Sequence, residues 1–482
     1  MSQTNIVYKV EDNPGWAKTI VFALQQLLAI LAATIAVPAI IGNGMSPAAA
    51  LLGAGVGTLV YLLFTKFKSP VFLGSSFAFI SSMFAAFGGA VAMGLNEKVG
   101  FLGLIIGAGG AALVYVIIAL VVKFVGTAWI NKIMPAVVIG PTVAIIGLSL
   151  AKNAVWDLLG VANGTDLANT AMTPTMWLAL LCGLVTLFTT IIFSVYGKGF
   201  LKMIPFIFGI LAGYALASIF TGIGWAAKVD AMKLVDFEKF THMEWLPNFT
   251  FVQMIGGLKE TPFENAGQFF SYFGAVLLAY VPVAFVVFAE HIADHKNLGS
   301  IIERDLLAEP GLHRTLLGDG VGSFAGAIFG GCPNTTYGES VGTVAISGNA
   351  SIRTIFVTAL MAMVLAFIAP FSTFLSTIPS CVMGGVCIAL YGFIAVSGLK
   401  MIQNVDLGEN RNLFVVSVIL IAGVGGLTIN IALGANLAPI VITEVACALI
   451  LGILVNLAVN ARKQKQAEPA NEAPAQEEKE EK

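Results

Sequence analysis

The stretch GCPNTTYGESVG, residues 331–342, breaks an apolar segment (332–350) at Pro333, Gly338 and Gly342. Proline lacks a backbone N–H and glycine tolerates non-helical geometry, so this segment is not expected to form one continuous helix. The break also carries a carboxylate, Glu339. Interrupted apolar segments with an acidic residue at the break are typical of substrate sites in membrane transporters.

A second apolar segment, residues 70–93, is broken in the same way by the triplet Gly74-Ser-Ser76. Each broken segment is the third of seven in its half of the chain. Residues 134–140 (MPAVVIG) also resemble residues 378–384 (IPSCVMG) at an offset of 244 positions. Repeats with an odd number of membrane spans are inverted relative to each other, and paired broken helices in such repeats are typical of alternating-access transporters.

The composition places the whole chain in a membrane. Of 482 residues, 57% are apolar and 11% are charged, against roughly 25% charged in a typical soluble domain. This balance excludes a soluble enzyme, a nucleic-acid-binding protein and a disordered chain. Five cysteines without metal-type spacing are expected to be packing residues, and the sequence gives no reason to expect a metal or another cofactor.

About 20 apolar residues cross a bilayer as a helix, and fourteen segments come near this length. Read in order, they are 17–41, 46–65, 70–93, 99–122, 133–151, 175–196, 201–222, 267–294, 315–331, 332–350, 354–376, 380–399, 412–430 and 437–460. Lys and Arg concentrate in alternate short loops, which predicts that both termini are cytoplasmic. The sequence therefore predicts an all-α, multi-pass membrane protein of the cell (plasma) membrane, embedded in the lipid bilayer.

The predicted organisation follows from this count. It has a cytoplasmic N-terminus (1–16), a first seven-span repeat (17–222), an extracellular loop (223–264), a second, inverted repeat (265–461) and a disordered cytoplasmic tail (462–482). The tail is predicted to be disordered because Ala, Glu, Pro and Lys dominate it.

Carboxylates inside the apolar segments are the candidate functional groups, because charge in the hydrocarbon is costly. Glu290 follows a long apolar run, and Asp294 lies one helical turn further on the same face. Hydropathy alone also allows Glu290 to lie at the cytoplasmic end of its helix. Glu444, near the outer end of the last segment, is a lesser candidate. Asp319 and His295 are expected near the membrane interface.

Together with Ala289-Glu-His291 and Gly74-Ser-Ser-Phe77, the quoted stretch resembles the nucleobase–ascorbate transporters, also called the nucleobase:cation symporter-2 family. The resemblance covers residues 17–461 and is strongest to the bacterial uracil permease branch. It implies short strands in spans 3 and 10. It also implies a core domain (spans 1–4 and 8–11), a gate domain (spans 5–7 and 12–14), proton-coupled uptake and a homodimer.

The resemblance also implies a substrate site. Two carboxylates would hold the base, two residues would offer backbone groups, and three side chains would line the pocket. The carboxylates are Glu290 and Glu339, and the backbone groups are those of Phe77 and Gly338. The lining side chains are Ala33, Tyr337 and Tyr391. Carboxylates accept hydrogen bonds from the ring N–H groups of uracil, and free amides at a helix N-terminus donate to its carbonyls. A buried carboxylate, Glu290 or Asp294, would carry the coupled proton.

The sequence departs from the family pattern at three places. Asp294 stands where the uracil branch usually has His, and an acid at this position resembles purine members. Gln26 replaces the first-span His of some uracil members. In the family signature Gln/Glu-Asn-x-Gly-x-x-x-x-Thr, Ser340 and Ser347 replace the Asn and the Thr.

We therefore expect a uracil:proton symporter, with a xanthine or other purine importer of the same family as the alternative. An anion channel or exchanger on the same fold is less favoured, since two acids at the site oppose anion binding. A membrane enzyme is disfavoured because HExxH, paired metal-ligand histidines and a serine–lysine dyad are missing from the sequence. No catalytic residue and no nucleic-acid partner are expected.

Overall fold

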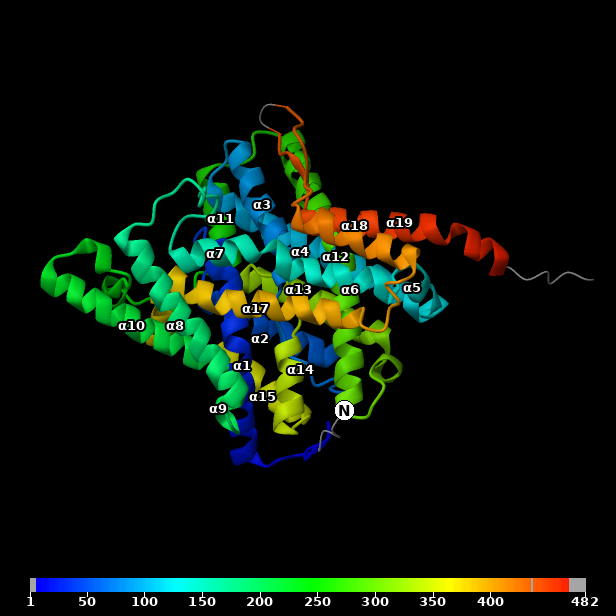
Figure 1. Ribbon diagram of the computed structural model, residues 1–482, viewed down its shortest axis with the longest axis horizontal. Coiled ribbons are helices and arrows are strands. Elements are labelled where there is room, and N and C mark those ends of the chain that lie inside the picture. Colours follow the sequence, from blue (N-terminus) through cyan, green and yellow to red (C-terminus); the bar gives the residue numbers. More distant parts are fainter. Residues whose placement is uncertain (1–5, 435–436, 468–482) are drawn as a thin grey trace, which may run out of the picture.

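The computed structural model describes residues 6–434 and 437–467, and this part of the chain is mostly helical (Figure 1). In the first half, the elements are α1 (Trp16–Ile41), α2 (Pro47–Phe64), β1 (Leu73–Ser75), η1 (Phe77–Phe79), α3 (Ile80–Ala92), η2 (Glu97–Val99), α4 (Gly100–Val125), α5 (Ala128–Ile133), α6 (Ala136–Ser149), α7 (Ala151–Leu159), α8 (Pro174–Tyr196), α9 (Phe200–Met203) and α10 (Pro205–Ala227).

The remaining elements are η3 (Asp230–Met232), η4 (Phe237–Thr241), α11 (Thr250–Glu260), α12 (Ala266–Ile301), η5 (Leu307–Gly311), α13 (Leu312–Gly330), β2 (Asn334–Thr336), α14 (Gly338–Ser347), α15 (Ile352–Leu365), α16 (Ala369–Thr377), α17 (Ser380–Met401), α18 (Asn410–Val424), β3 (Ile429–Ile431), β4 (Ile440–Ile442) and α19 (Glu444–Ala467).

The two broken segments meet as a pair of short antiparallel strands, β1 and β2. Leu73 lies opposite Thr336, Gly74 opposite Thr335, and Ser75 opposite Asn334. The Ser76 N–H donates to the Pro333 carbonyl at 2.9 Å, which extends the pairing by one bond. From this pair, η1–α3 and α14 leave in opposite directions, α3 toward the upper part of Figure 1 and α14 toward the lower part. The breaks therefore satisfy one another's backbone groups and leave two helix starts at one place.

Each of the fourteen predicted segments contains at least one helix, and segment 354–376 is the pair α15 and α16, bent by 82°. In the described residues, eight helices are long and apolar enough to cross a membrane, and the bent pair α15–α16 would make a ninth. Three shorter apolar helices are Phe77–Ala92, Asn410–Val424 and Glu444–Asn460. The protein is thus a helical, multi-pass membrane protein, and the count of fourteen crossings remains a prediction.

Three details differ from the expected elements. Strand β3 begins at the end of segment 412–430, and β4 lies near the start of segment 437–460. The two strands pair as a β-hairpin, which the apolar content of the sequence did not reveal. The loop 223–264 contains α11 and two short helical turns. Helix α19 continues to Ala467, past the predicted end of the last span, and the rest of the predicted tail lies outside the described residues.

The helices pack as two groups. In one, α13 packs against α2 and α4, α12 packs against α4, and α15 packs against α1 and α2. In the other, α17 packs against α6, α7 and α8, α10 packs against α8, and α18 packs against α6 and α19. All five cysteines are buried, as expected for packing residues.

Glycine makes the α2–α13 contact possible. A Cβ on Gly326 would lie 2.7 Å from the Gly53 carbonyl oxygen and closer still to the Asn334 side-chain amide. That amide donates to the same Gly53 carbonyl at 2.9 Å, while the Asn334 N–H donates to the Ser323 hydroxyl at 2.9 Å. The first residue of β2 is therefore anchored between two closely packed helices.

An N-terminal strap, residues 6–13, lies along the turn that follows α14. The Val7 and Tyr8 N–H groups donate to the Gly348 carbonyl at 2.8 and 3.1 Å, and the Ala350 N–H donates to the Tyr8 carbonyl at 2.8 Å. Arg304, just after α12, donates to the Glu11 carboxylate at 2.6 Å. This ion pair lowers the pKa of Glu11. The strap thus connects the ends of α12 and α14.

We expect Gly326→Ala to destabilise the protein by about 1–3 kcal/mol, because the added methyl group overpacks the α2–α13 contact. Gly88→Ala is the matched control, since Gly88 is exposed on α3 and nothing lies within 4 Å of the position of its Cβ. Thermal unfolding of the purified proteins in detergent measures both. Equal melting temperatures for the two variants would contradict this account of the contact.

Candidate functional site

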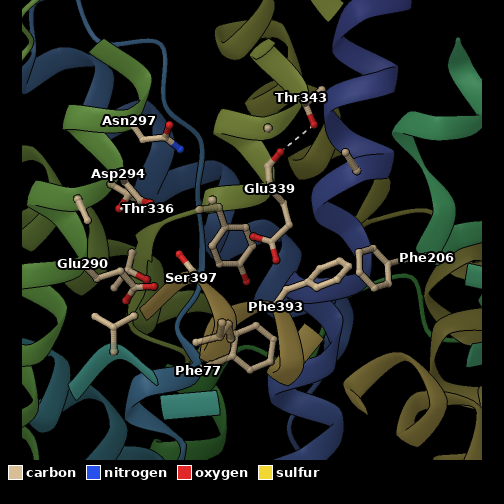
Figure 2. A pocket seen from close by; sticks show the side chains of 18 of the residues that line it. Phe77, Phe206, Glu290, Asp294, Asn297, Thr336, Glu339, Thr343, Phe393 and Ser397 are labelled. Atoms are coloured by element: carbon tan, nitrogen blue, oxygen red, sulfur yellow. Dashed lines mark hydrogen bonds between the residues drawn. The ribbon is translucent and has the colours of Figure 1, made fainter. Parts of the chain in front are cut away.

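A cavity of about 370 Å³ lies beside the strand pair (Figure 2). Parts of α12, α14, α17 and η1 line it, together with the residues around the start of α10. Its volume falls in the range of small-molecule sites, roughly 300–1,000 Å³.

Three carboxylates line the cavity: Glu290 and Asp294 from α12, and Glu339 from the first turn of α14. Helix α12 continues to Ile301, so Glu290 lies well inside it rather than at its end. In Figure 2, the two α12 acids approach from one side and Glu339 from the neighbouring helix. Within the described residues, the Glu290 and Glu339 side chains accept no hydrogen bond from another residue, whereas Thr336 donates to Asp294 at 2.6 Å. The cavity therefore presents two carboxylates without partners and one that a strand residue orients.

The strand ends supply the opposing groups. Gly338 is the first residue of α14, and the position of its Cβ has no atom within 4 Å, so the backbone there is open to the cavity. Free N–H groups at the start of a helix favour a hydrogen-bond acceptor. Phe77, at the start of η1, adds an apolar wall, and Tyr391 supports its ring edge-on at a centroid distance of 5.8 Å.

The structure brings six of the eight predicted site residues to the cavity: Phe77, Glu290, Asp294, Tyr337, Gly338 and Glu339. Ala33 and Tyr391 are buried and do not line it in this conformation; Ala29, one turn before Ala33, does. Tyr337 is also largely buried, and its hydroxyl donates to the Ser75 carbonyl at 2.6 Å. Tyr337 and Tyr391 thus shape the site mainly by packing behind it.

Sequence reasoning missed several lining residues. They are Thr336, Asn297, Ser397, Phe393, Phe206 and Lys202. Asn297 could have been found, because it lies on the helical face of Glu290 and Asp294. Phe393 and Ser397 could not have been found, because nothing in the apolar sequence of α17 distinguishes them from packing residues.

Two of the departures from the family pattern contact each other. The Gln26 side-chain amide donates to the Ser340 hydroxyl at 2.6 Å, and this hydroxyl also accepts from the Phe72 N–H at 3.2 Å. Gln26 does not line the cavity. These bonds connect α1, α14 and the residue before β1 behind the carboxylates.

A buried polar cluster behind α12 corrects the expectation that Asp319 and His295 lie near the interface. Both are completely buried, as is His291. His291 Nδ1 lies 2.7 Å from an Asp319 carboxylate oxygen, and His291 Nε2 lies 2.9 Å from the Thr315 hydroxyl. His295 Nε2 lies 2.7 Å from the Tyr61 hydroxyl. The partners of these side chains come from α2 and α13, which are distant in sequence. The charge of the neighbouring Lys296 therefore gave no indication that His295 is buried.

The cavity extends away from the strand pair along α14. Gly342, Thr343 and Ile346 line it at successive turns of that helix, and Ile346 is 53% exposed. Only Phe77 and Ala78 line it on the η1–α3 side. The site is therefore open on the side of α14.

A sequence model described as Permease family matches residues 17–432. The chain belongs to this Permease family. It is accordingly a membrane permease and not an enzyme.

Proteins named uracil permease are similar over most of their length. Those of Bacillus caldolyticus and Bacillus subtilis (strain 168) are 38% identical to this chain over 429 and 437 residues. The aligned residues cover 88% and 90% of this chain, and 89% and 91% of the relatives. The uracil permease of Escherichia coli (strain K12) is 34% identical over 426 residues, which cover 88% of each chain.

Solved structures share the fold at low identity. The transmembrane domain of the cyanobacterial bicarbonate transporter BicA has a TM-score of 0.59 at 16% identity, with 92% of this chain and 96% of that chain covered. SLC26A9 has a TM-score of 0.60 at 11% identity, with 93% of this chain and 65% of that chain covered. These likenesses show a membrane-transporter fold.

Proposed function

We propose that the protein is a secondary transporter that imports a nucleobase, preferentially uracil, by proton symport and alternating access. The observation that carries the proposal is a cavity with two carboxylates, Glu290 and Glu339, that have no hydrogen-bond partner in the described part of the chain and lie beside the open backbone at Gly338. The similarity to proteins named uracil permease over most of the chain supports uracil as the base.

The chemistry of uracil matches these groups. Its flat ring carries two N–H donors and two carbonyl acceptors. Glu290 and Glu339 accept from the N–H groups, and backbone N–H groups at Phe77 and Gly338 donate to the carbonyls. Phe77 and Phe393 give the ring apolar walls. Each polar edge of the ring thus has a partner of opposite kind.

The two packing groups support a division into core and gate. The helices that carry the acids and the strand pair form the core, and α6, α8, α10, α17, α18 and α19 form the gate. The fourteen crossings belong to two inverted seven-span repeats, with both termini cytoplasmic in the plasma membrane. The cavity would then open to the cytoplasm. The family resemblance supports a homodimer.

A purine such as xanthine is the second candidate substrate. Asp294 faces the cavity, and its carboxylate would add an acceptor for a third N–H group, which xanthine has and uracil lacks. Anion transport is opposed by the three carboxylates, although Lys202 also lines the cavity and the fold neighbours include a bicarbonate transporter.

Uptake of labelled uracil by permease-deficient cells tests the function directly. We expect the expressed protein to accumulate uracil, and excess unlabelled uracil to compete better than xanthine, thymine or guanine. Preferential competition by xanthine would select the purine alternative, and no uptake of any base would overturn the proposal.

We expect Glu339→Gln to lower uracil affinity by at least about tenfold, since 1.4 kcal/mol is a factor of ten. Gln keeps one acceptor oxygen but places an NH₂ group against a ring N–H, which leaves buried polar groups unpaired. Calorimetry on purified protein measures the effect. Glu303→Gln, an exposed site beyond α12, is the matched control. Parent-like affinity in Glu339→Gln would remove Glu339 from the substrate acceptors.

We expect a protonophore to abolish the accumulation of uracil. We also expect Asp294→Asn to impair uracil accumulation more than the equilibrium binding of uracil. Glu290 and Asp294 lie one helical turn apart, so their like charges repel in a site of low dielectric and one of them is expected to hold a proton. The comparison is between uptake in cells across a pH series and calorimetry on the purified variant. Asp230→Asn, at the exposed start of η3, is the control. Sodium-dependent uptake that resists a protonophore would contradict proton coupling.

A further inference from the structure

A second cavity, of about 380 Å³, lies on the α3 side of the strand pair. It lies between α3, the junction of α6 and α7, the loop after α7 and the first residue of α19. Its lining includes Ser81, Phe84, Ser149, Asn153, Asn163 and Glu444. The mechanism proposed above makes no use of these residues.

Under the proposed organisation into two inverted repeats, this cavity is the counterpart of the central one. Strand β1 begins at Leu73 and β2 begins at Asn334, and the same offset relates Ser81 on α3 to Gly342 on α14, which lines the central cavity. The offset of 244 positions between the repeats relates Ser149 and Asn153 to Phe393 and Ser397, which also line it. Inverted repeats exchange the two faces of a transporter, so equivalent residues line the paths to opposite faces.

The two cavities differ in how they reach the strand pair. Ser81, four residues beyond Phe77, donates to one Glu444 oxygen at 2.7 Å. This bond joins α3 to α19 across the two packing groups, on the side opposite the open cavity. Within the described residues, the two cavities share no lining residue, so in this state the second cavity is closed toward the central site.

We propose that this cavity is a second binding subsite for the nucleobase, located at the mouth that opens in the other state of the transport cycle. The inference rests on the proposed function. Glu444 accepts a ring N–H through the carboxylate oxygen that Ser81 leaves free. Asn153 and Asn163 supply amide donors and acceptors, and Phe84 offers a ring face for stacking. The set repeats the carboxylate, the polar groups and the phenyl ring of the central site.

Two substitutions distinguish the role of Glu444 in binding the nucleobase from its role in the bond with Ser81. Glu444→Gln keeps an oxygen for the Ser81 hydroxyl but removes the anionic acceptor. Ser81→Ala removes the closing bond and keeps the carboxylate. Glu97→Gln is the matched control, because Glu97 is exposed in the turn between α3 and α4, on the same side of the molecule.

We expect Glu444→Gln to raise KM for uracil uptake about tenfold, the factor for one charge-assisted hydrogen bond, with Vmax unchanged. Ser81→Ala and Glu97→Gln should keep KM within about twofold of the parent. Calorimetry on purified Glu444→Gln should give parent affinity, since the central site is intact. An unchanged KM, or a loss of calorimetric affinity equal to the rise in KM, would overturn the subsite. Failure of the parent to take up any base would instead overturn the proposed function.

Cysteine labelling gives a second readout in a chain that retains Glu444. The five native cysteines are buried, so Asn163→Cys introduces a thiol at the mouth against a low background. We expect uracil to slow its reaction with a membrane-impermeant maleimide, and to lose this effect when Glu444→Gln is added. Equal protection by uracil in both backgrounds would overturn the role of Glu444.

Discussion

The antiparallel pairing of β1 with β2 is the constraint on which the rest of the structure depends. A chain that leaves helical geometry inside a membrane must satisfy its backbone groups elsewhere, and here each broken segment satisfies the other. The pairing fixes the starts of η1 and α14 at one point, which is why Phe77, Gly338 and Glu339 share one cavity. Because Asn334 is anchored between α2 and α13, the packing of these two helices fixes the position of the site.

Behind the cavity, α12 is held by polar contacts on its opposite face. The Thr315 hydroxyl donates to the Leu312 carbonyl at 3.0 Å, so His291 Nε2 must be the donor in its bond to Thr315. One further proton is then shared between His291 Nδ1 and the Asp319 carboxylate. The cluster is completely buried, and breaking a buried pair costs far more than breaking an exposed one. It fixes the rotation of α12 and hence the direction in which Glu290 and Asp294 point.

The sequence predicted those parts of the site that backbone chemistry dictates. Pro333, Gly338 and the Gly-Ser-Ser triplet marked both breaks, and the carboxylates inside the apolar segments, Glu339 at one break and Glu290 and Asp294 elsewhere, marked the cavity. The depth of Glu290 remained open, because hydropathy does not show where a long helix such as α12 ends. Burial of Asp319 and His295 depended on partners distant in sequence. The β3–β4 hairpin was missed because its strands are as apolar as the spans they join.

The N-terminal strap has a consequence for the order of assembly. Tyr8 pairs with residues on either side of Asn349, so this segment waits for partners that are synthesised much later. Contacts of such long sequence separation form late, since a large loop must close first. The strap can dock only after α14 and the first residue of α15 have been made, because the Ile352 N–H donates to the Val10 carbonyl. Docking therefore follows the synthesis of α12 and α14, the two helices that carry the carboxylates of the cavity.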